Sequence, residues 1–595
     1  MPKKWIISPA VPNEFLNSHP ELPPIVARLL YNRNIKTQEK IDEFLNPDYS
    51  EDIHDPFLFD DMEKAVEIIL SHVKQQKNIV VHGDYDADGV CAAAIIVSCL
   101  QKIGAQHVSV FLPHRETDGY GLNFNTVKDL KKKNTDLIIT CDCGVSNTPE
   151  VQMVKELGMM IIITDHHSVP ANIPPADAII HPKMPNETYP DKGLCGGAVA
   201  FKLVQALLKK HQATNSTLLD GQSHEAFEKW LLDLVAIASI GDMVPLIGES
   251  RTLTRYGLTV LNKTHNLGLK KLMFVAGIMD ENDQPKRGVI EAHTVGYQIV
   301  PRLNAAGRMD HANSAYALLM ATDEREAENL AEQLNQNNLD RQKLTEGLVN
   351  QAIQQIKETE QEKNSALFAF SEDWPTGVLG LVSGRLKDIF YKPALAMGKS
   401  SDGEIVGSGR SISEFNLIAA MQERPEFFDK FGGHPQACGF TLKSKSALEE
   451  FKKFLNEKVV AETKGVELVP QVNIDSEVDL DEIDWDMYDL LQKFEPFGMN
   501  NEEPIYAAYG LTIINIDPVG QDGKHLRMKL KHNSQVIRKT IGFGLGDTTK
   551  HPDDWKNNLH PGEKIDIAFC VEVNKWNGNR ELQMTIHDIK KSVLN

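Results

Sequence analysis

The run Val80-Val81-His82-Gly83-Asp84-Tyr85-Asp86-Ala87-Asp88-Gly89 decides the expected fold of this chain. The apolar segment 78–82 predicts a buried strand, and residues 89–103 predict a helix directly after the acidic turn. Three carboxylates at every second position repel one another, which raises carboxyl pKa values unless a cation lies among them. Hard ions such as Mg²⁺ or Mn²⁺ suit such a group, and the imidazole of His82 favours Mn²⁺.

The run has two other interpretations, a calcium-binding loop and a helix-capping turn. A calcium loop of the Asp-x-Asp-x-Asp-Gly type needs a glutamate at its twelfth position, where this chain has Ile95, and such a loop leaves a helix rather than a strand. The run could also be an Asp-rich turn that caps the helix at Gly89, because aspartate is a favoured N-cap. This second alternative stays open on the run alone.

Further apolar runs end in polar residues in the same way: 107–112, 136–140, 159–164 and 178–180. Helix-like segments such as 125–133 separate them. Continuous apolar strands that alternate with helices predict an α/β fold with a doubly wound parallel sheet covered on both faces. Ligands of such sheets bind beyond the carboxyl ends of the strands.

Aspartate and histidine follow three more apolar runs: Asp142 after 137–141, Asp165-His166-His167 after 161–164, and Asp242 after 234–240. Each group alone is typical of an ordinary turn or a structural histidine. Together they should lie at strand ends that converge on one sheet edge. Two metal ions held there would clamp a phosphoryl group and activate water.

Cys141 and Cys143 flank Asp142, which raises the possibility of zinc. Alternation along an extended strand points both away from Asp142, and no second cysteine pair has zinc-finger spacing. We therefore expect both cysteines to pack in the core.

The remaining chain predicts further domains. Residues 323–362 are mostly polar and nearly free of proline and glycine, which indicates a long linking helix. Mixed α/β character follows, and then β-rich segments at 505–515, 525–531, 565–574 and 582–587 predict an OB-like β-barrel. The expected domains are residues 1–322, with an irregular or helical lead-in over 1–70, then 323–362, 363–462 and 463–595.

Composition limits the class of protein. The net charge of −20 argues against a nucleic-acid-coating protein but not against an enzyme with local basic grooves. No apolar run approaches the roughly 20 residues of a membrane span, Met1–Pro12 does not resemble a signal peptide, and the seven cysteines are scattered. We expect a cytoplasmic protein without membrane contact. The sequence has no Walker-type loop, Gly-x-Ser-x-Gly elbow or His-Glu-x-x-His motif, so ATP hydrolysis and serine-type hydrolysis are unsupported.

Several candidate binding segments lie outside the acidic motifs. Arg410 lies in the run 407–411 and His434 in the run 431–439, where glycines predict turns that let a backbone approach an anion. The alternative is two ordinary glycine-rich turns. The segment 524–531 alternates basic with apolar residues, which predicts a strand with one basic face that could track single-stranded nucleic acid. Trp576 and Tyr506 could stack bases or fill the core, with core favoured for Tyr506.

The His-x-x-x-Asp-x-Asp run, Asp142, the Asp165-His166-His167 triplet and Asp242 resemble the four motifs of the DHH phosphoesterase superfamily. The resemblance implies six metal ligands for two Mn²⁺ or Mg²⁺ ions, with Asp142 bridging them: His82, Asp86, Asp88, Asp142, His166 and Asp242. It implies a catalytic set of Asp86, Asp88, Asp142, His166, His167 and Asp242, with Asp84 nearby. The Gly-Gly-His run resembles the DHH-associated domain, and the resemblance implies six substrate-binding residues: Arg115, Arg302, Arg308, Ser408, Arg410 and His434. Surface arginines in loops are the alternative for Arg115, Arg302 and Arg308.

The resemblance covers nearly the whole chain and implies a single-stranded-DNA-specific 5′→3′ exonuclease in DNA recombination, mismatch repair and base-excision repair. Its implied partners are single-stranded DNA with a 5′ end, a single-strand-binding protein and a RecQ-type helicase, and a monomer is expected. The polarity rests on the resemblance alone. A phosphoesterase of short oligonucleotides or cyclic dinucleotides remains an alternative. A non-catalytic replication scaffold is a third class, disfavoured because such proteins lose metal ligands that this chain retains.

Overall fold

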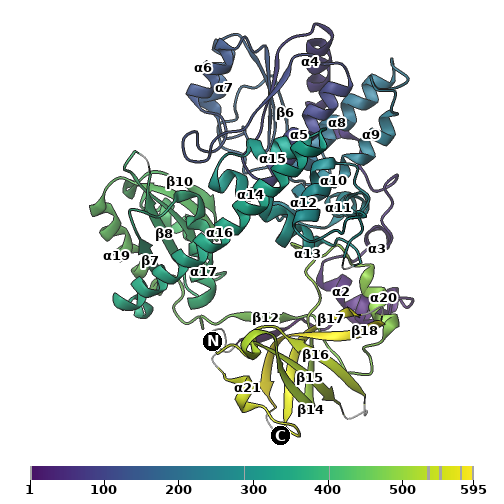
Figure 1. The fold of residues 1–595 in the computed structure, drawn as a ribbon, viewed down its shortest axis with the longest axis vertical. Coiled ribbons are helices and arrows are strands. Elements are labelled where there is room, and N and C mark those ends of the chain that lie inside the picture. The colour runs from purple at the N-terminus through teal and green to yellow at the C-terminus, as the bar shows by residue number, and fades with distance from the viewer. Residues whose placement is uncertain are drawn as a thin grey trace. The chain divides into compact units, whose positions relative to one another are not determined.

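The computed structural model describes residues 3–286, 288–400, 402–532, 536–548, 553–576 and 579–592, without the side chains of residues 575, 576 and 579. The chain forms two compact units, which are described separately (Figure 1). Unit 1 contains Met1–Leu45, Thr345–Glu495 and Glu502–Asn595, and unit 2 contains Asn46–Leu344 and Pro496–Asn501. Within the described ranges, every helix is too short or too polar to span a bilayer.

Unit 2 is built on a five-stranded parallel sheet with the strand order β3-β2-β4-β5-β6. The order reverses between β2 and β4, so the chain has a topological switch point there, where doubly wound sheets bind ligands. The strands match the predicted runs closely: β2 (Ile79–His82), β3 (Val108–Phe111), β4 (Leu137–Cys141), β5 (Met160–Thr164) and β6 (Ala178–Ile180).

Helices cover both faces of this sheet, as predicted, because apolar side chains of every central strand are buried on either side. One face packs against α4 (Met62–Lys74), α5 (Ala87–Lys102) and α8 (Gly196–Gln212). The opposite face packs against α6 (Phe124–Lys132) and α7 (Thr148–Glu156). The doubly wound α/β fold is confirmed.

The rest of unit 2 is helical, and it corrects one prediction. The apolar run before Asp242, predicted to end as a strand, is helix α10 (Leu232–Gly241), whose residues 232–239 are all buried. A fully buried segment has neither helical nor strand periodicity, so its pattern cannot separate the two structures. The other helices are α9 (His224–Trp230), α11 (Gly248–Leu261), α12 (Leu267–Val275), α13 (Ala292–Thr294), the π-helical turn η2 (Val295–Ile299), α14 (Val300–Met309) and α15 (Asn313–Met320).

The predicted linking helix is present as α16 (Glu324–Glu358), which is 35 residues long and runs from unit 2 into unit 1. After it, unit 1 has a mixed sheet in the order β10-β11-β9-β8-β7, in which only β7 and β8 are parallel. Its strands are β7 (Leu367–Phe370), β8 (Ala394–Lys399), β9 (Ile405–Arg410), β10 (Phe428–His434) and β11 (Ala437–Leu442), and its helices are α17 (Leu379–Phe390), α18 (Leu417–Gln422) and α19 (Lys445–Glu462).

The glycines of the segments 407–411 and 431–439 were predicted to lie in turns, and this was wrong for four of them; the turn of the second segment is at residues 435–436, between β10 and β11. Gly407 and Gly409 lie inside β9, and Gly432 and Gly433 lie inside β10. A Cβ at Gly407 would meet the Phe440 ring at 2.2 Å, and one at Gly409 would meet Leu417 at 2.6 Å. These two glycines therefore mark close packing beneath a strand, a role that glycine also has in sheets.

The predicted C-terminal barrel is confirmed. The strands run β14-β15-β16-β18-β17, and a further pairing between β14 and β17 closes them into a five-stranded barrel. They are β14 (Tyr506–Val519), β15 (His525–Lys531), β16 (Ile537–Gly542), β17 (Lys564–Trp576) and β18 (Asn579–Lys591), joined by the short β13 (Ser476–Glu477) and by α20 (Trp485–Gln492) and α21 (Trp555–Asn558). Tyr506 is fully buried, as expected, and the Trp576 side chain lies outside the described residues.

The N-terminal lead-in differs from the expected irregular or helical segment. It begins with a strand, β1 (Lys4–Ile7), which pairs in parallel with β12 (Gln471–Ile474), and only then forms α1 (Asn13–Ser18), α2 (Pro24–Asn32) and α3 (Gln38–Leu45). This pairing joins segments more than 460 residues apart, which no local pattern could indicate. Residues 1–45, grouped above with the first domain, accordingly pack in unit 1.

Candidate metal centre

The carboxylates of the acidic turn after β2 have two different roles. Asp86 is the N-cap of α5, and its Oδ1 accepts hydrogen bonds from the backbone N–H groups of Asp88 (3.0 Å) and Gly89 (3.2 Å). The alternative of an Asp-capped helix is thus correct for Asp86. It does not explain Asp84 and Asp88, which are buried at 4% and 1% exposure, where a charge needs a partner.

Asp88 is held by the start of another helix. Its two carboxylate oxygens accept hydrogen bonds from the backbone N–H groups of Gly196 (2.8 Å) and Gly197 (2.6 Å), the first residues of α8. A helix N-terminus presents unpaired N–H groups and positive partial charge, so it stabilises a buried carboxylate.

Asp142 lies directly after β4 in a left-handed backbone conformation (φ 61°), which aspartate tolerates better than most residues. Its backbone N–H donates to the carbonyl of Thr164 on the neighbouring strand (3.0 Å), so the two strand ends stay aligned. Cys141 and Cys143 on either side are fully buried, which confirms the expectation that both pack in the core.

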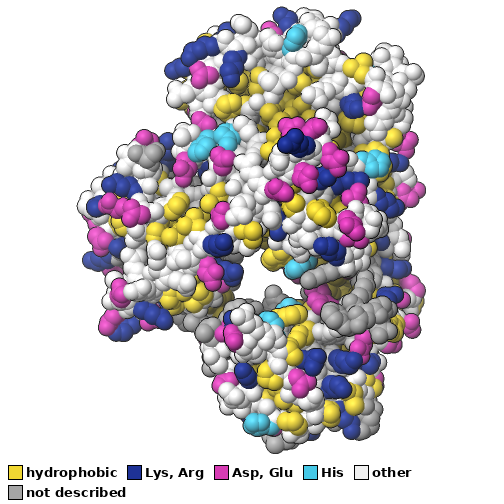
Figure 2. Space-filling view, in the orientation of Figure 1, with side chains coloured by type: hydrophobic (Ala, Val, Ile, Leu, Met, Phe, Trp, Pro, Cys, Tyr) yellow, Lys and Arg dark blue, Asp and Glu magenta, His cyan; other side chains and the backbone are white. Residues whose placement is uncertain are grey.

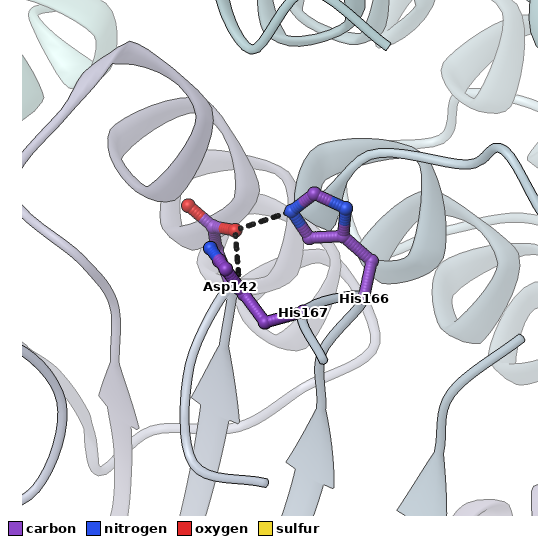
Figure 3. A group of neighbouring side chains, drawn as sticks. All are labelled: Asp142, His166 and His167. Carbon is purple, nitrogen blue, oxygen red and sulfur yellow. Dashed lines mark ion pairs between the residues drawn. The ribbon is translucent and has the colours of Figure 1, made fainter. Parts of the chain in front are cut away.

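His166 brings three of the acidic groups together. Its Nε2 lies 3.2 Å from Asp142 Oδ1, 3.4 Å from Asp242 Oδ2 and 3.8 Å from Asp88 Oδ2. Figure 3 shows His166 and His167 directed at Asp142 from the end of the neighbouring strand. Asp242 is the C-cap of α10, so a helix end rather than a strand end delivers it to the same place.

His167 is oriented by Asp165. The His167 Nδ1 lies 2.8 Å from Asp165 Oδ1, and Asp165 also accepts hydrogen bonds from the backbone N–H groups of His166, His167 and Val145. The Tyr120 hydroxyl, 3.0 Å from the same Nδ1, donates to the carbonyl of Asp142 at 3.1 Å. Asp165 and Tyr120 therefore fix the position of His167 beside Asp142.

Three overlapping groups could each hold a cation, since their ligand atoms lie within 4.8 Å of one another: Asp84–Asp86–Asp142, Asp88–His166–Asp242 and Asp142–His166–His167. Asp142 and His166 each belong to two of them. His82 belongs to none, although its ring is fully buried after β2. The other five predicted ligands lie together in this centre, with Asp84 and His167.

Unpartnered atoms test whether this centre fits a metal ion. Among the described residues, four buried atoms here lack a hydrogen-bond partner: His82 Nε2, Asp84 Oδ1, Asp142 Oδ1 and His166 Nε2. Buried polar atoms are normally satisfied, and imidazole nitrogens and carboxylate oxygens are the ligands that Mn²⁺ and Mg²⁺ take. The residues present therefore fit a divalent cation.

The electrostatics of the metal-free centre support the same conclusion. Burial, together with the charges of Asp88 and Asp86, raises the pKa of Asp142 well above its ordinary value. Burial also raises the pKa of Asp88 to about 6 and that of Asp242 to about 8. Burial lowers the pKa of His166 to about 3 and that of His82 to about 4, so both imidazoles are neutral and can offer a lone pair.

Sequence reasoning missed the contribution of Gly196 and Gly197. A Cβ at Gly196 would lie 2.5 Å from Asp142 Cβ, and one at Gly197 would lie 2.6 Å from Ala238 Cβ. The two glycines open a long apolar helix, a pattern that signals close approach at a helix N-terminus. Lys183, whose Nζ donates to the carbonyl of His166 (2.7 Å), was also missed and has no sequence signal.

We expect Gly196→Ala to weaken Mn²⁺ binding at least about tenfold in titration calorimetry, because the new methyl group displaces the Asp142 carboxylate. Gly347→Ala is the matched control, since this glycine lies inside α16 with nothing within 4 Å of an added Cβ. Equal Mn²⁺ affinities in the two variants would show that Asp142 is not a ligand.

The predicted substrate-binding arginines of unit 2 separate into two places. The Arg115 guanidinium lies over the Tyr85 ring of the acidic turn, 4.0 Å from its centroid. Arg308, in the last turn of α14, acts electrostatically on the same tyrosine. Arg302 instead donates to Asn335 Oδ1 of α16 (3.0 Å) and to the carbonyl of Gln298 (2.7 Å).

The predicted substrate-binding residues of unit 1 share one face of its sheet. Ser408 and Arg410 of β9 pair with Gly439 and Ala437 of β11, and Ala437 in turn pairs with His434 of β10. Residues two apart on a strand point to the same face, so Ser408, Arg410 and His434 lie together. Arg410 donates to Ser408 Oγ (3.1 Å), and the first turn of α17 lies close to both, because a Cβ at Gly380 would meet Arg410 at 2.9 Å and Ser408 Oγ at 3.1 Å.

Comparisons with known proteins agree with this architecture. Family models match residues 78–239 (DHH family, N-terminal domain), 363–461 (DHHA1 domain) and 474–588 (RecJ OB domain). The chain is 34% identical to the single-stranded-DNA-specific exonuclease RecJ of Bacillus subtilis, covering 95% of this chain and 68% of that protein. It is 30% identical to RecJ of Haemophilus influenzae, covering 95% of this chain and 96% of that protein. The crystal structure of Thermus thermophilus RecJ in complex with Mn²⁺ superimposes with a TM-score of 0.80 at 25% identity, covering 99% of this chain and 80% of that one.

Proposed function

Since the chain belongs to the RecJ family of single-stranded-DNA-specific exonucleases, we propose that it removes nucleotides from single-stranded DNA by metal-dependent hydrolysis of phosphodiesters. The observation that carries this function is the convergence of carboxylates that follow β2 and β4, the imidazoles that follow β5 and Asp242 at the end of α10, with unpartnered ligand atoms among them. We further propose that degradation proceeds 5′→3′, in DNA recombination and repair.

Mn²⁺ or Mg²⁺ would be held by His82, Asp86, Asp88, Asp142, His166 and Asp242, with Asp142 shared between two ions. RecJ of Thermus thermophilus has been solved with each of these metals. When bound, such ions lower the pKa of a water ligand and stabilise the departing oxygen of a phosphodiester. The buried backbone donors of Gly196 and Gly197 keep the Asp88 carboxylate oriented for this task.

His167 completes the catalytic set. Burial acts to lower its pKa, but the hydrogen bond and charge of Asp165 outweigh burial and raise the pKa to about 9. The Nδ1 hydrogen bond to Asp165 orients the ring, and in the metal-free protein the raised pKa keeps it protonated, so that Nε2–H can donate to a phosphate oxygen.

We propose that the Ser408–Arg410–His434 face binds a phosphate of the substrate, and that Arg115 and Arg308 contact the strand beside the acidic turn. Arg302, already bonded to Asn335, would act by positioning α14. Arg410 is half-buried, and among the described residues no carboxylate lies within ion-pair distance of it, so an anion would supply its missing partner. Gly380, in the first turn of α17, lets that helix pack directly against Ser408 and Arg410, which keeps this face rigid.

We expect Arg410→Ala to raise KM on 5′-phosphorylated single strands about tenfold or more, with a smaller change in kcat, because a charge-assisted phosphate contact is lost. The preference for 5′-phosphate over 5′-hydroxyl ends should fall with it. Arg424→Ala, which removes a half-exposed arginine paired with Glu426 in the same unit, is the control. An unchanged KM in Arg410→Ala would contradict phosphate binding at this face.

The barrel provides a second binding surface. Along β15 the apolar residues Leu526, Met528 and Leu530 are buried, whereas Arg527 and Lys529 are exposed and Lys531 is half-exposed, which confirms the predicted two-faced strand. Basic side chains are visible over the barrel in Figure 2. We propose that this face follows the backbone of single-stranded DNA.

Replacing both Arg527 and Lys529 with alanine should weaken single-strand binding and reduce the salt dependence of binding, by about 0.7 in log–log slope per lost phosphate contact. Fluorescence anisotropy across a salt series measures this, with Lys464→Ala, an exposed lysine outside the barrel strands, as control. If the salt dependence of binding is unaltered in the double variant, single-stranded DNA does not bind this face of β15.

For the domain organisation we propose residues 46–322 as the DHH domain, 323–362 as the linking helix, 363–462 as the DHH-associated domain and 463–595 as the OB domain. Residues 1–45 are reassigned to accompany the last two, because β1 pairs with β12. We also propose a cytoplasmic monomer that works beside a single-strand-binding protein and a RecQ-type helicase.

End-labelled digestion tests the proposed activity. Single strands carrying a label at either terminus are incubated with the purified chain and Mn²⁺, Mg²⁺ or chelator, beside duplex, dinucleotides and cyclic dinucleotides. The proposal predicts that the 5′ label is released first, that duplex resists and that chelator stops the reaction. Release of the 3′ label first would contradict the polarity, and cleavage of dinucleotides alone would favour the phosphoesterase of short substrates.

A further inference from the structure

Unit 1 contains a second group of metal-ligating side chains, on the OB barrel and separate from the catalytic set. Glu503, Cys570 and Glu572 place a thiol and two carboxylates within 4.8 Å of one another. His587 adds a fourth candidate ligand, an imidazole, since its Nε2 lies 3.4 Å from Cys570 Sγ. One thiol, one imidazole and two carboxylates make up a complete set for a four-coordinate ion.

The fold brings these residues from three segments of the chain. Cys570 and Glu572 are two residues apart on β17, so they point to the same face of the barrel. Glu503 comes from the segment just before β14. His587 belongs to the antiparallel neighbour β18.

The strand pairing between β17 and β18 is irregular at His587. Ala568 pairs with Asp588 and Phe569 pairs with Ile586, so His587 is an extra residue on β18 at a β-bulge. Bulges re-aim side chains and are common beside functional sites. Thr585 is the pairing partner of Cys570, and His587 is two residues further along β18, so alternation places the imidazole on the same face as the thiol.

The chemistry of the group is unusual for a packing cluster. Cys570 is 1% exposed, yet its thiol lies 4.0 Å from Glu572 Oε1 and interacts with Glu503. Burial and the two nearby carboxylates raise the pKa of this thiol, so in the absence of a cation it stays protonated. A bound cation would instead favour the thiolate and neutralise the carboxylates.

We propose that Glu503, Cys570, Glu572 and His587 form a structural site for a zinc-class divalent cation that fastens β17, β18 and the segment before β14 together. A thiolate is a soft ligand that selects zinc over Mn²⁺ and Mg²⁺, so this site differs in metal preference from the catalytic centre. Two contacts support the ligands from behind: Thr585 Oγ1 donates to Glu572 Oε2 (2.8 Å), and Lys3 Nζ donates to the His587 carbonyl (3.0 Å). Binding releases the thiol proton to solvent, so affinity rises with pH.

Cobalt is the probe that tests this proposal, because Co²⁺ replaces Zn²⁺ and a thiolate ligand gives it a near-ultraviolet charge-transfer band. The full-length chain, stripped with chelator, is titrated with Co²⁺ alone and then challenged with Zn²⁺ or excess Mn²⁺. We expect a band that Zn²⁺ abolishes and Mn²⁺ does not. The band should persist in Cys99→Ser, which changes another buried cysteine, and be absent from Cys570→Ser.

Glu572→Gln keeps the test decisive if Cys570→Ser fails to fold, because Glu572 is exposed and tolerates substitution. We expect this variant to bind Co²⁺ at least about tenfold more weakly and to lose most of the Zn²⁺-induced rise in Tm. A wild-type chain without the band, a band that survives Cys570→Ser, or an unchanged Co²⁺ affinity in Glu572→Gln would each overturn the proposal.

Discussion

Asp142→Asn should lower kcat for single-strand hydrolysis by at least about a thousandfold, which corresponds to about 4 kcal/mol of lost transition-state stabilisation. Asp142 shares ligand-atom groups with Asp84, Asp86, His166 and His167, so no other carboxylate can take its place. Asparagine keeps the shape of the side chain but removes the charge needed to hold two cations together.

The same variant should remain folded. Asparagine tolerates the left-handed conformation of residue 142, whereas Asp142→Ala would add roughly 1–2 kcal/mol of backbone strain and blur the result. Removing one of several mutually repelling buried carboxyls should leave the free energy of unfolding in chelator unchanged or higher.

Asp283→Asn is the matched control for this experiment. Asp283 also has a left-handed backbone (φ 55°), but it is exposed and pairs with Lys270. Wild-type kcat is expected there, measured by release of acid-soluble nucleotides. A kcat in Asp142→Asn within about tenfold of wild type would remove Asp142 from the mechanism.

The metal-free protein should become less stable as pH rises from 6.5 to 8. In this range the unfolded chain has already released its carboxyl protons, whereas folded Asp242, with a pKa of about 8, and Asp142, whose pKa is raised further, still hold theirs. The folded state then binds more protons than the unfolded state, so the free energy of unfolding falls with pH, by at least about 1.4 kcal/mol per pH unit.

The histidines of the centre do not reverse this decrease of the free energy of unfolding with pH. His82 and His166, with lowered pKa values, are neutral in the folded state, whereas in the unfolded chain they are half-protonated near pH 6.5 and lose these protons by pH 8. They therefore oppose the decrease in stability only near pH 6.5, where the protons held by Asp142, Asp242 and His167 outweigh them. His167, with a pKa of about 9, keeps a proton that the unfolded chain loses, which adds to the same trend. Saturating Mn²⁺ replaces the carboxyl protons, so the trend should vanish or reverse.

Thermal unfolding in chelator and in Mn²⁺ across this pH range measures the effect. In chelator, the decrease of Tm with pH should be smaller in Asp142→Asn, which lacks one of the titrating groups. It should be unchanged in Asp283→Asn. A Tm in chelator that rises with pH between 6.5 and 8 would contradict the crowded, metal-deprived site described above.

The parallel sheet and most of its acidic edge could be predicted from the sequence, because buried parallel strands are continuous apolar runs that end in polar residues. Asp142 and His166 were found in this way. Asp242 was predicted correctly, but the run before it was taken for a strand and is the helix α10. Complete burial removes the periodicity that distinguishes a helix from a strand.

Features that depend on distant segments could not be predicted. Gly196 and Gly197 matter because they approach Asp142 and Asp88; two glycines at the start of an apolar helix signal a close approach, but no local pattern identifies these two partners. The pairing of β1 with β12 is of the same kind. Gly407 and Gly409 resembled turn residues, but their role is to make room for Phe440 and Leu417 beneath a strand.

Anomalous scattering from crystals soaked in Mn²⁺ tests the central claim most directly, because the signal locates manganese independently of any assumed ligand. The arrangement of Asp142 and His166 in overlapping ligand groups predicts two peaks about 3.5–4 Å apart, with Asp142 between them. Peaks elsewhere, or none among these carboxylates and imidazoles, would contradict a two-metal nuclease centre in this protein.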